Sequence, residues 1–568
     1  MKKTASKIHV LTIFAAEIHT MPETHANIPG RRASVLRMAC ALALIIGAAI
    51  PGYMLAKYGV NYTDEPYQIL NAMDYRHSPL SALSSYLYGL YGNATGFGWL
   101  QMRYIALSIV NLAILAGGWY LWRSSGNALA SGAVTAAALL GSGMSRMTFN
   151  LFGWDNLSVL LIVMTMLAAL RFLRKPGAGI TTGAAALTAL AILSRLPNLS
   201  VVIAMAAVII AGSRNPGERR RLLFLYLIAT LLLTISAVSI LFGSPLIYIE
   251  TLSRNIISQH NIKSLIAIYA VDGCRLLFIV CTVRVMLRTI DFTMGWKAPK
   301  TLKGAILVII GATLFVSLHF LSYFVSDIYY ASALVIVALL YYVLPLGNNR
   351  SCRRRLLQAA TVAIFGLALI AGSNLGVRKF ISWPLIPVAA AFLLKKCTFR
   401  RLAVYGAVLF IPLLLQLRVV CLRQSFLDAG TEGATACIEH GPASGLYTTP
   451  GIKEEIEDIA EARASLPPGT DMAVAGEGTR RFLYEYLFGS RSLYAPHNWS
   501  ETPLLDSKEY IEWIETKVAN RKDNPLAILC LRRSDGQVPG MEKMLDGSSA
   551  ERRRYANFTL YLFQPQTH

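Results

Sequence analysis

Charged residues are scarce in this chain, and over most of its length acidic residues are the scarcest. Only 15% of the 568 residues are charged, whereas 54% are hydrophobic. This composition excludes an ordinary soluble globular protein and is typical of a polytopic membrane protein. The eight cysteines are scattered without a C-x-x-C pair, which argues against a zinc or redox motif.

The net positive charge belongs to one region of the chain. Residues 1–420 hold 38 Lys and Arg against 11 Asp and Glu, a net charge of +27, whereas residues 421–568 hold 16 against 21, a net charge of −5. In the first region, the loops between apolar segments alternate in charge. Those predicted to lie inside carry roughly 27 basic residues, and those predicted to lie outside carry about 8. Such asymmetry orients membrane helices, so we expect membrane lipids and no nucleic acid as partners.

About thirteen apolar segments approach the length of a membrane span. The segment pair around S-R-L-P-N can also form one kinked helix. The predicted fold class is therefore an α-helical polytopic membrane protein. The predicted spans are 38–56, 101–122, 128–146, 157–173, 180–195, 197–212, 222–242, 265–287, 304–322, 328–346, 356–373, 380–394 and 401–420.

Three regions follow from this map. Residues 1–37 form a cytoplasmic leader, residues 38–420 the transmembrane domain with a first outer loop at 57–100, and residues 421–568 a soluble domain outside the membrane. The last region alternates predicted helices with the apolar strands DMAVAG, LAILCL and FTLYLF, which indicates a small α/β domain. Cys421 and Cys437 flank its start. The sequence allows either a disulfide between them or two separate thiols.

The few acids of the transmembrane region gather on one side of the predicted membrane. Asp64, Glu65 and Asp74 share the first outer loop, and Asp155 begins the fourth span at the same face. Carboxylates near lipid are costly, and one held there can act as a general base. The alternative is that Asp64 and Glu65 are solvated, or stabilise the start of a helix ahead of Pro66.

An acid pair directly after the first span, an acid opening the fourth span and an outer C-terminal domain together resemble the GT-C glycosyltransferases. The similarity is to the branch of protein mannosyltransferases and lipid A aminoarabinose transferases, and the matching residues are Asp64, Glu65 and Asp155. The resemblance implies inverting transfer of a sugar from a polyprenyl-phosphate donor to a glycan, lipid or protein acceptor. The reaction is expected at the periplasmic face of a bacterial cytoplasmic membrane.

In this interpretation Asp64 is the general base, and Glu65 or Asp155 orients the acceptor or a metal. Carboxylates suit Mg²⁺ or Mn²⁺, but some branches of the family work without a metal, so the cofactor stays open. The donor phosphate needs cations at the same face. Those expected to bind it are Arg76, Arg254, Lys263 and Arg275, with His77, Arg195, His260, Arg378 and Lys379 as further candidates.

Each of these cations can instead extend to lipid headgroups, and Arg275 can simply pair with Asp272 one helical turn away. Rival functions are a transporter or lipid-linked sugar flippase without catalytic activity, a ligase or polymerase of the O-antigen type, and a receptor presenting its C-terminal domain. A transporter commonly shows internal repeats and charges at the bilayer midplane. Here no repeat is detected and the acids gather at one surface.

The loop asymmetry predicts that the N-terminus is cytoplasmic and that residues 421–568 lie on the other side. A reporter that is active only outside the cytoplasm, fused after Pro565, should therefore be active. An odd number of spans is needed to put the two ends of the chain on opposite sides of the membrane. A silent fusion, together with an active cytoplasmic reporter at the same position, would reject that odd number.

Overall fold

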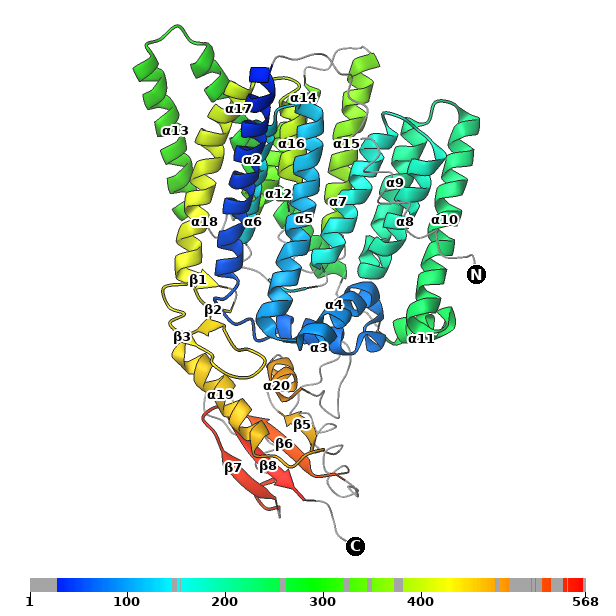
Figure 1. Cartoon of the computed structure of the whole chain (residues 1–568), viewed down its shortest axis with the longest axis vertical. Coiled ribbons are helices and arrows are strands. Elements are labelled where there is room, and N and C mark those ends of the chain that lie inside the picture. The colour runs from blue at the N-terminus through cyan, green and yellow to red at the C-terminus, as the bar shows by residue number, and fades with distance from the viewer. Residues whose placement is uncertain are drawn as a thin grey trace.

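The computed structural model of the chain describes most of the helical region and about two thirds of the C-terminal region. Figure 1 shows a bundle of long helices with a smaller region of strands at one end. The described residues are 28–145, 151–153, 155–255, 262–320, 327–344, 350–371, 382–425, 427–475, 480–489, 512, 516, 524–532, 545–548 and 550–564.

Each predicted span overlaps a helix within the described residues. Eight of the described helical segments are long and apolar enough to cross a membrane, and three shorter ones are also apolar. A short 3₁₀ turn, Leu196–Asn198, separates α8 from α9, so S-R-L-P-N joins two helices. The bundle helices are α2 (Ile28–Leu55), α5 (Trp99–Ser125), α6 (Ala128–Ser145), α7 (Asp155–Phe172), α8 (Ala178–Ser194), α9 (Leu199–Gly212), α10 (Pro216–Phe242), α12 (Ile262–Gly295), α13 (Lys300–Phe320), α14 (Asp327–Val343), α15 (Arg350–Ile370), α16 (Leu385–Leu393), α17 (Phe399–Tyr405) and α18 (Ile411–Arg423).

The first loop is helical and lies across one end of this bundle. It contains α3 (Asp64–Met73), two 3₁₀ turns (Tyr75–His77 and Pro79–Ser81) and α4 (Ala82–Thr95). The helix α11 (Pro245–Asn255) and the C-terminal region lie at the same end, at the bottom of Figure 1. We call it the loop end, and its counterpart the opposite end.

The C-terminal region combines helices with a four-stranded sheet of order β5-β6-β8-β7. Strand β6 pairs in parallel with β5 and antiparallel with β8, which also pairs antiparallel with β7. The strands predicted from DMAVAG, LAILCL and FTLYLF are confirmed as β5 (Asp471–Ala475), β6 (Leu526–Leu531) and β8 (Phe558–Phe563). The other elements are α19 (Pro450–Ala464), α20 (Arg481–Phe488), β1 (Gln424–Ser425), β2 (Asp428–Ala429), β3 (Ala436–Cys437), β4 (Tyr447–Thr448) and β7 (Glu551–Arg554).

This arrangement confirms the predicted fold class, a polytopic helical membrane protein with a small α/β region at its C-terminal side. In the described part of the chain, Cys421 and Cys437 are not joined by a disulfide. The Cys421 thiol instead donates to the carbonyl of Met144 at 3.1 Å. The sequence allowed a disulfide or two thiols at these positions, and the structure has two thiols.

Small residues let α2 and α6 approach closely. A Cβ atom added at Gly132 would lie 2.5 Å from the Cβ atom of Ala41, and one added at Gly143 would lie 2.8 Å from the Cα atom of Gly52. In a membrane, such contacts take the place of the hydrophobic driving force between helices.

Replacing Gly132 by Leu should force α2 away from α6 and lower the free energy of unfolding by about 1–3 kcal/mol, the usual cost of overpacking. Gly183→Leu is the matched control, because a Cβ atom there meets nothing within 4 Å. Thermal unfolding in detergent measures both variants. Equal midpoints for the two would show that the approach of α2 to α6 does not limit stability.

Candidate functional site

The first helix of the loop begins at the acid pair. The side-chain oxygen of Asn61 accepts hydrogen bonds from the backbone N–H groups of Thr63 (3.2 Å) and Asp64 (3.1 Å) and from the Thr63 hydroxyl (3.0 Å). Asn61 is itself buried. This local turn fixes where α3 starts, and it places Asp64 and Glu65 in the first helical turn.

The two neighbouring acids have different environments. Asp64 is partly exposed at the start of the helix, whereas Glu65 is completely buried. The Glu65 carboxylate forms an ion pair with Arg103 of α5, with 2.5 Å between Oε2 and Nη2. Residues one position apart on a helix point about 100° apart, so one acid can face the bundle while the other faces outward.

Both oxygens of the Glu65 carboxylate accept hydrogen bonds from at least two N–H groups. Besides Arg103, the indole of Trp99 donates to Oε2 at 3.1 Å, and the backbone N–H of Phe152 donates to Oε1 at 2.9 Å. The same guanidinium donates to the carbonyls of Ala56 and Gly59, each at 2.8 Å. The pair therefore joins the end of α2, the start of α3, α5 and the link between α6 and α7.

The second expected acid begins α7, three residues after Phe152. Asp155 forms an ion pair with Arg195 at 3.3 Å; the Asp155 side chain is 15% exposed, whereas Arg195 is buried. Arg195 lies in the break between α8 and α9, where its backbone is extended. Because Phe152 is bonded to Glu65, the link that leads to Asp155 is held against the start of α3.

A polar network supports the loop that carries Arg195. The amide of Asn198 donates to the hydroxyl of Ser158 at 2.6 Å and to the carbonyl of Ala191 at 2.8 Å. The hydroxyl of Ser84, from α4, donates to the carbonyl of Ser194 at 3.0 Å. The first loop, α7 and α8 therefore meet at this point of the loop end.

The C-terminal region covers the same surface. The ring of Phe482 in α20 packs on Tyr67 of α3 with 4.8 Å between centroids, and the guanidinium of Arg480 lies 5.0 Å from the ring centroid of Tyr62. Arg480 also pairs with Glu455 at 3.4 Å. Burial raises the pKa of the Glu455 carboxyl, and Arg480 opposes that shift.

Backbone hydrogen bonds connect the two regions as well. The N–H of Gly59 donates to the carbonyl of Tyr447 at 2.8 Å, and that of Trp99 donates to the carbonyl of Pro442 at 2.8 Å. The N–H of Val60 donates to the Asp428 carboxylate at 2.8 Å. The loop that bears the acid pair is therefore built partly from residues of the C-terminal region.

The expected phosphate-binding cations are not all in one cluster. Arg76 is exposed in the first loop and donates to the hydroxyl of Tyr75 at 3.4 Å, an interaction that raises its pKa. The ring of Tyr75 packs against an apolar cluster that includes Leu193, two residues before Arg195. This cluster places Arg76 on the same side of the loop end as α8.

Arg275 belongs to another part of the bundle. It lies 3.9 Å from the carboxylate of Asp272, which also accepts from the hydroxyl of Tyr329 at 2.5 Å. Lys263 is exposed at the start of α12. His260, Arg378 and Lys379 lie outside the described residues, as do the side chains of His77 and Arg254.

Sequence reasoning missed Arg103, the partner that decides the geometry of the acid pair. Its signal was a single basic residue inside an apolar span, four residues after Trp99 and therefore on the same helical face. Within the described ranges, no group of three or more His, Cys, Asp or Glu side chains is arranged to hold a metal ion.

The chain was compared with known proteins by sequence and by structure, and two similar solved structures are described below. No family model matches the chain, and no curated protein matches it. Among solved structures, the oligosaccharyltransferase of Archaeoglobus fulgidus, crystallised with zinc and sulfate, is similar at 12% identity over 85% of this chain and 67% of that chain, with a TM-score of 0.44.

The arabinosyltransferase EmbB of Mycobacterium smegmatis is similar at 15% identity, with a TM-score of 0.33. The similarity covers 70% of this chain and 43% of that one. With TM-scores below 0.5, neither similarity establishes the activity, the donor or the residues that act.

Replacing Glu65 by Gln should destabilise the protein strongly. The change leaves the Arg103 guanidinium buried without its counter-charge, which typically costs about 3–5 kcal/mol. Glu432→Gln is the control, because that acid is exposed and such surface changes usually stay within about 0.5 kcal/mol. Thermal unfolding in detergent compares the two, and a Glu65→Gln midpoint equal to that of the control would contradict the role of the ion pair.

Proposed function

We propose that this protein is an integral-membrane glycosyltransferase of the GT-C type, acting at the loop end. It would move a sugar from a polyprenyl-phosphate donor to a glycan, lipid or protein acceptor. The observation that carries the proposal is the joint placement of two acids. Asp64 opens α3 and Asp155 opens α7, and the buried Glu65 bonds to the link that leads to Asp155.

Asp64 is the general base in this proposal. Its carboxylate is partly exposed at a helix N-terminus, so an acceptor can reach it. It takes the proton from the acceptor O–H or N–H group while that atom forms a bond to the anomeric carbon. The bond between the anomeric carbon and the phosphate oxygen breaks, and the electron pair leaves with the polyprenyl phosphate, which inverts the sugar.

Glu65 acts as a positioning residue in this scheme. Its two oxygens are engaged by Arg103, Trp99 and the Phe152 amide, so it neither faces an acceptor nor supplies a free ligand to Mg²⁺ or Mn²⁺. The sequence predicted that Glu65 or Asp155 orients the acceptor or a metal; in this proposal Asp155 keeps that role and Glu65 acts indirectly. It fixes the start of α3 so that Asp64 faces outward.

Asp155 and Arg195 form the second part of the proposed site. Asp155 is partly exposed at the loop end, and the largely buried guanidinium beside it has further N–H groups that would donate to a phosphate entering the site. Arg76 is an exposed cation that can contribute from the first loop. Arg254, Lys263 and Arg275 remain proposed donor-phosphate residues.

The proposed location follows from the charge asymmetry of the loops. The opposite end, which carries most of the basic residues, would face the cytoplasm of a bacterial cell, and the loop end with the C-terminal region would face the periplasm. The lipid-linked donor would reach the loop end laterally through the membrane.

Asp64→Asn preserves size and hydrogen-bonding shape but cannot take up the acceptor's proton. Because general-base catalysis contributes typically about 10²–10⁴-fold, sugar transfer should fall by about that factor. Binding of the donor should change little, since the base acts on the acceptor. The assay is transfer from a polyprenyl-phosphate sugar in proteoliposomes, and thermal unfolding checks that the variant is folded.

Glu432→Gln is the control, since this acid is exposed and has no role in the proposed site. It should retain nearly full transfer. A folded Asp64→Asn protein with activity equal to the control would remove the base from this loop. Absence of transfer by the unmodified protein, accompanied by movement of the lipid-linked sugar across the bilayer, would favour the flippase instead.

A further inference from the structure

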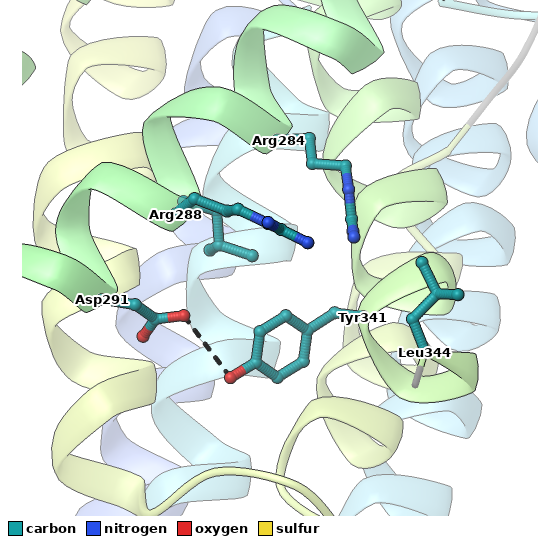
Figure 2. A pocket seen from close by; sticks show the side chains of 6 residues that line it. Arg284, Arg288, Asp291, Tyr341 and Leu344 are labelled. Atoms are coloured by element: carbon teal, nitrogen blue, oxygen red, sulfur yellow. Dashed lines mark hydrogen bonds between the residues drawn. The ribbon is translucent and has the colours of Figure 1, made fainter. Parts of the chain in front are cut away.

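A cavity between α12 and α14 lies apart from the proposed site. It has a volume of about 440 Å³ and is lined by Arg284, Leu287, Arg288, Asp291, Tyr341 and Leu344. Figure 2 shows these side chains, with the guanidiniums of both arginines directed into the space between the helices. This volume lies within the usual range of about 300–1,000 Å³ for small-molecule sites.

The sequence places the charged residues on one side of α12. Arg284, Arg288 and Asp291 are separated by four and three positions, a spacing that brings side chains to one helical face. The cavity is completed by Tyr341 and Leu344 from α14 and the residue directly after it. Two arginines therefore share a cavity with two leucines.

The acid in this cavity is bonded to tyrosines and not to the arginines. The carboxylate of Asp291 accepts from the hydroxyl of Tyr405 at 2.5 Å and from that of Tyr341 at 3.5 Å. In the part of the chain that the structure describes, neither Arg284 nor Arg288 has a hydrogen-bond or ion-pair partner. The cavity therefore holds two guanidiniums and one carboxylate, which leaves an excess of positive charge, and neither guanidinium is bonded to that carboxylate.

The depth of the arginines fits the headgroup layer. Helix α12 has 34 residues, about 51 Å, and is longer than a hydrocarbon layer of about 30 Å. Arg284 and Arg288 lie in its final third, toward the end that leads to Trp296 and Lys300, which are residue types enriched at membrane interfaces. They are therefore placed toward the end opposite the proposed catalytic site.

The surroundings favour a lipid over a soluble anion. Arg284 is half-buried, whereas Arg288 reaches the surface of the bundle. Next to it on α12, Val285 and Phe292 are 65% and 70% exposed, as expected for side chains that contact lipid. A ligand that enters from this surface must itself have an apolar part.

We propose that this cavity binds the phosphate headgroup of an anionic phospholipid. The guanidiniums of Arg284 and Arg288 donate to the phosphate oxygens, for which arginine is well suited. Leu287 and Leu344 contact the apolar part of the lipid next to the phosphate. The site is independent of the proposed sugar transfer and lies in the other leaflet.

The test uses the full-length protein in a nonionic detergent, titrated with phosphatidylglycerol, phosphatidylcholine or inorganic phosphate. Binding is measured by native mass spectrometry and by the shift of the unfolding midpoint. Phosphatidylglycerol should bind and raise the midpoint. Arg284→Gln and Arg288→Gln should each weaken its binding about tenfold or more, the usual effect of losing a hydrogen bond between charged groups.

The control is Arg220→Gln, because Arg220 is exposed near the start of α10, at the same end of the bundle. It should leave phosphatidylglycerol binding unchanged. Arg288→Lys keeps the charge and should lose less than Arg288→Gln, which separates loss of binding from loss of folding.

Three results would overturn the proposal. An equal loss in Arg220→Gln would mean that the general charge of this end attracts the lipid. Equal binding of phosphatidylcholine would mean that the cavity does not select an anionic lipid. An equal midpoint shift with inorganic phosphate at the same concentration would assign the cavity to a free anion.

Discussion

The ion pair between Glu65 and Arg103 is the interaction on which the loop end depends. Both side chains are buried, and taking two charges out of water is favourable only when the remaining polar atoms are also bonded. Here Trp99, the Phe152 amide and two carbonyls after α2 complete the set. One carboxylate thereby determines the relative positions of four chain segments, and Asp64 and Asp155 are placed as a result.

Most of the fold could be predicted from the sequence because its signals are local. A stretch of nearly twenty apolar residues specifies a membrane helix wherever it occurs, and runs such as LAILCL specify strands because every residue of β6 is buried. Strand β7 was not predicted, since its residues Glu551–Arg554 are charged. It forms through backbone hydrogen bonds to β8, and as an edge strand it does not need apolar side chains.

The site was less predictable because it depends on contacts between distant residues. The sequence indicated that acids gather at one end, but it could not say which member of the pair at 64–65 faces the interior. That choice is made by Arg103, 38 positions away. A charged residue inside an apolar span needs a partner. This rule was used above only for acids, and using it for basic residues as well would have identified Arg103. The pairing of Arg195 with Asp155 was not predicted either, since Arg195 was considered only as a phosphate-binding candidate.

The bonds between the first loop and the C-terminal region have a consequence for the order of folding. The N–H of Val60 is bonded to Asp428, which is 368 positions later. At a synthesis rate of about 5–20 residues per second, roughly 20–70 s separate the two on the ribosome. During that interval the loop lacks the partners of Gly59, Val60 and Trp99, although the helices around it are already made. The first loop to be synthesised is thus among the last parts of the protein to reach its native structure.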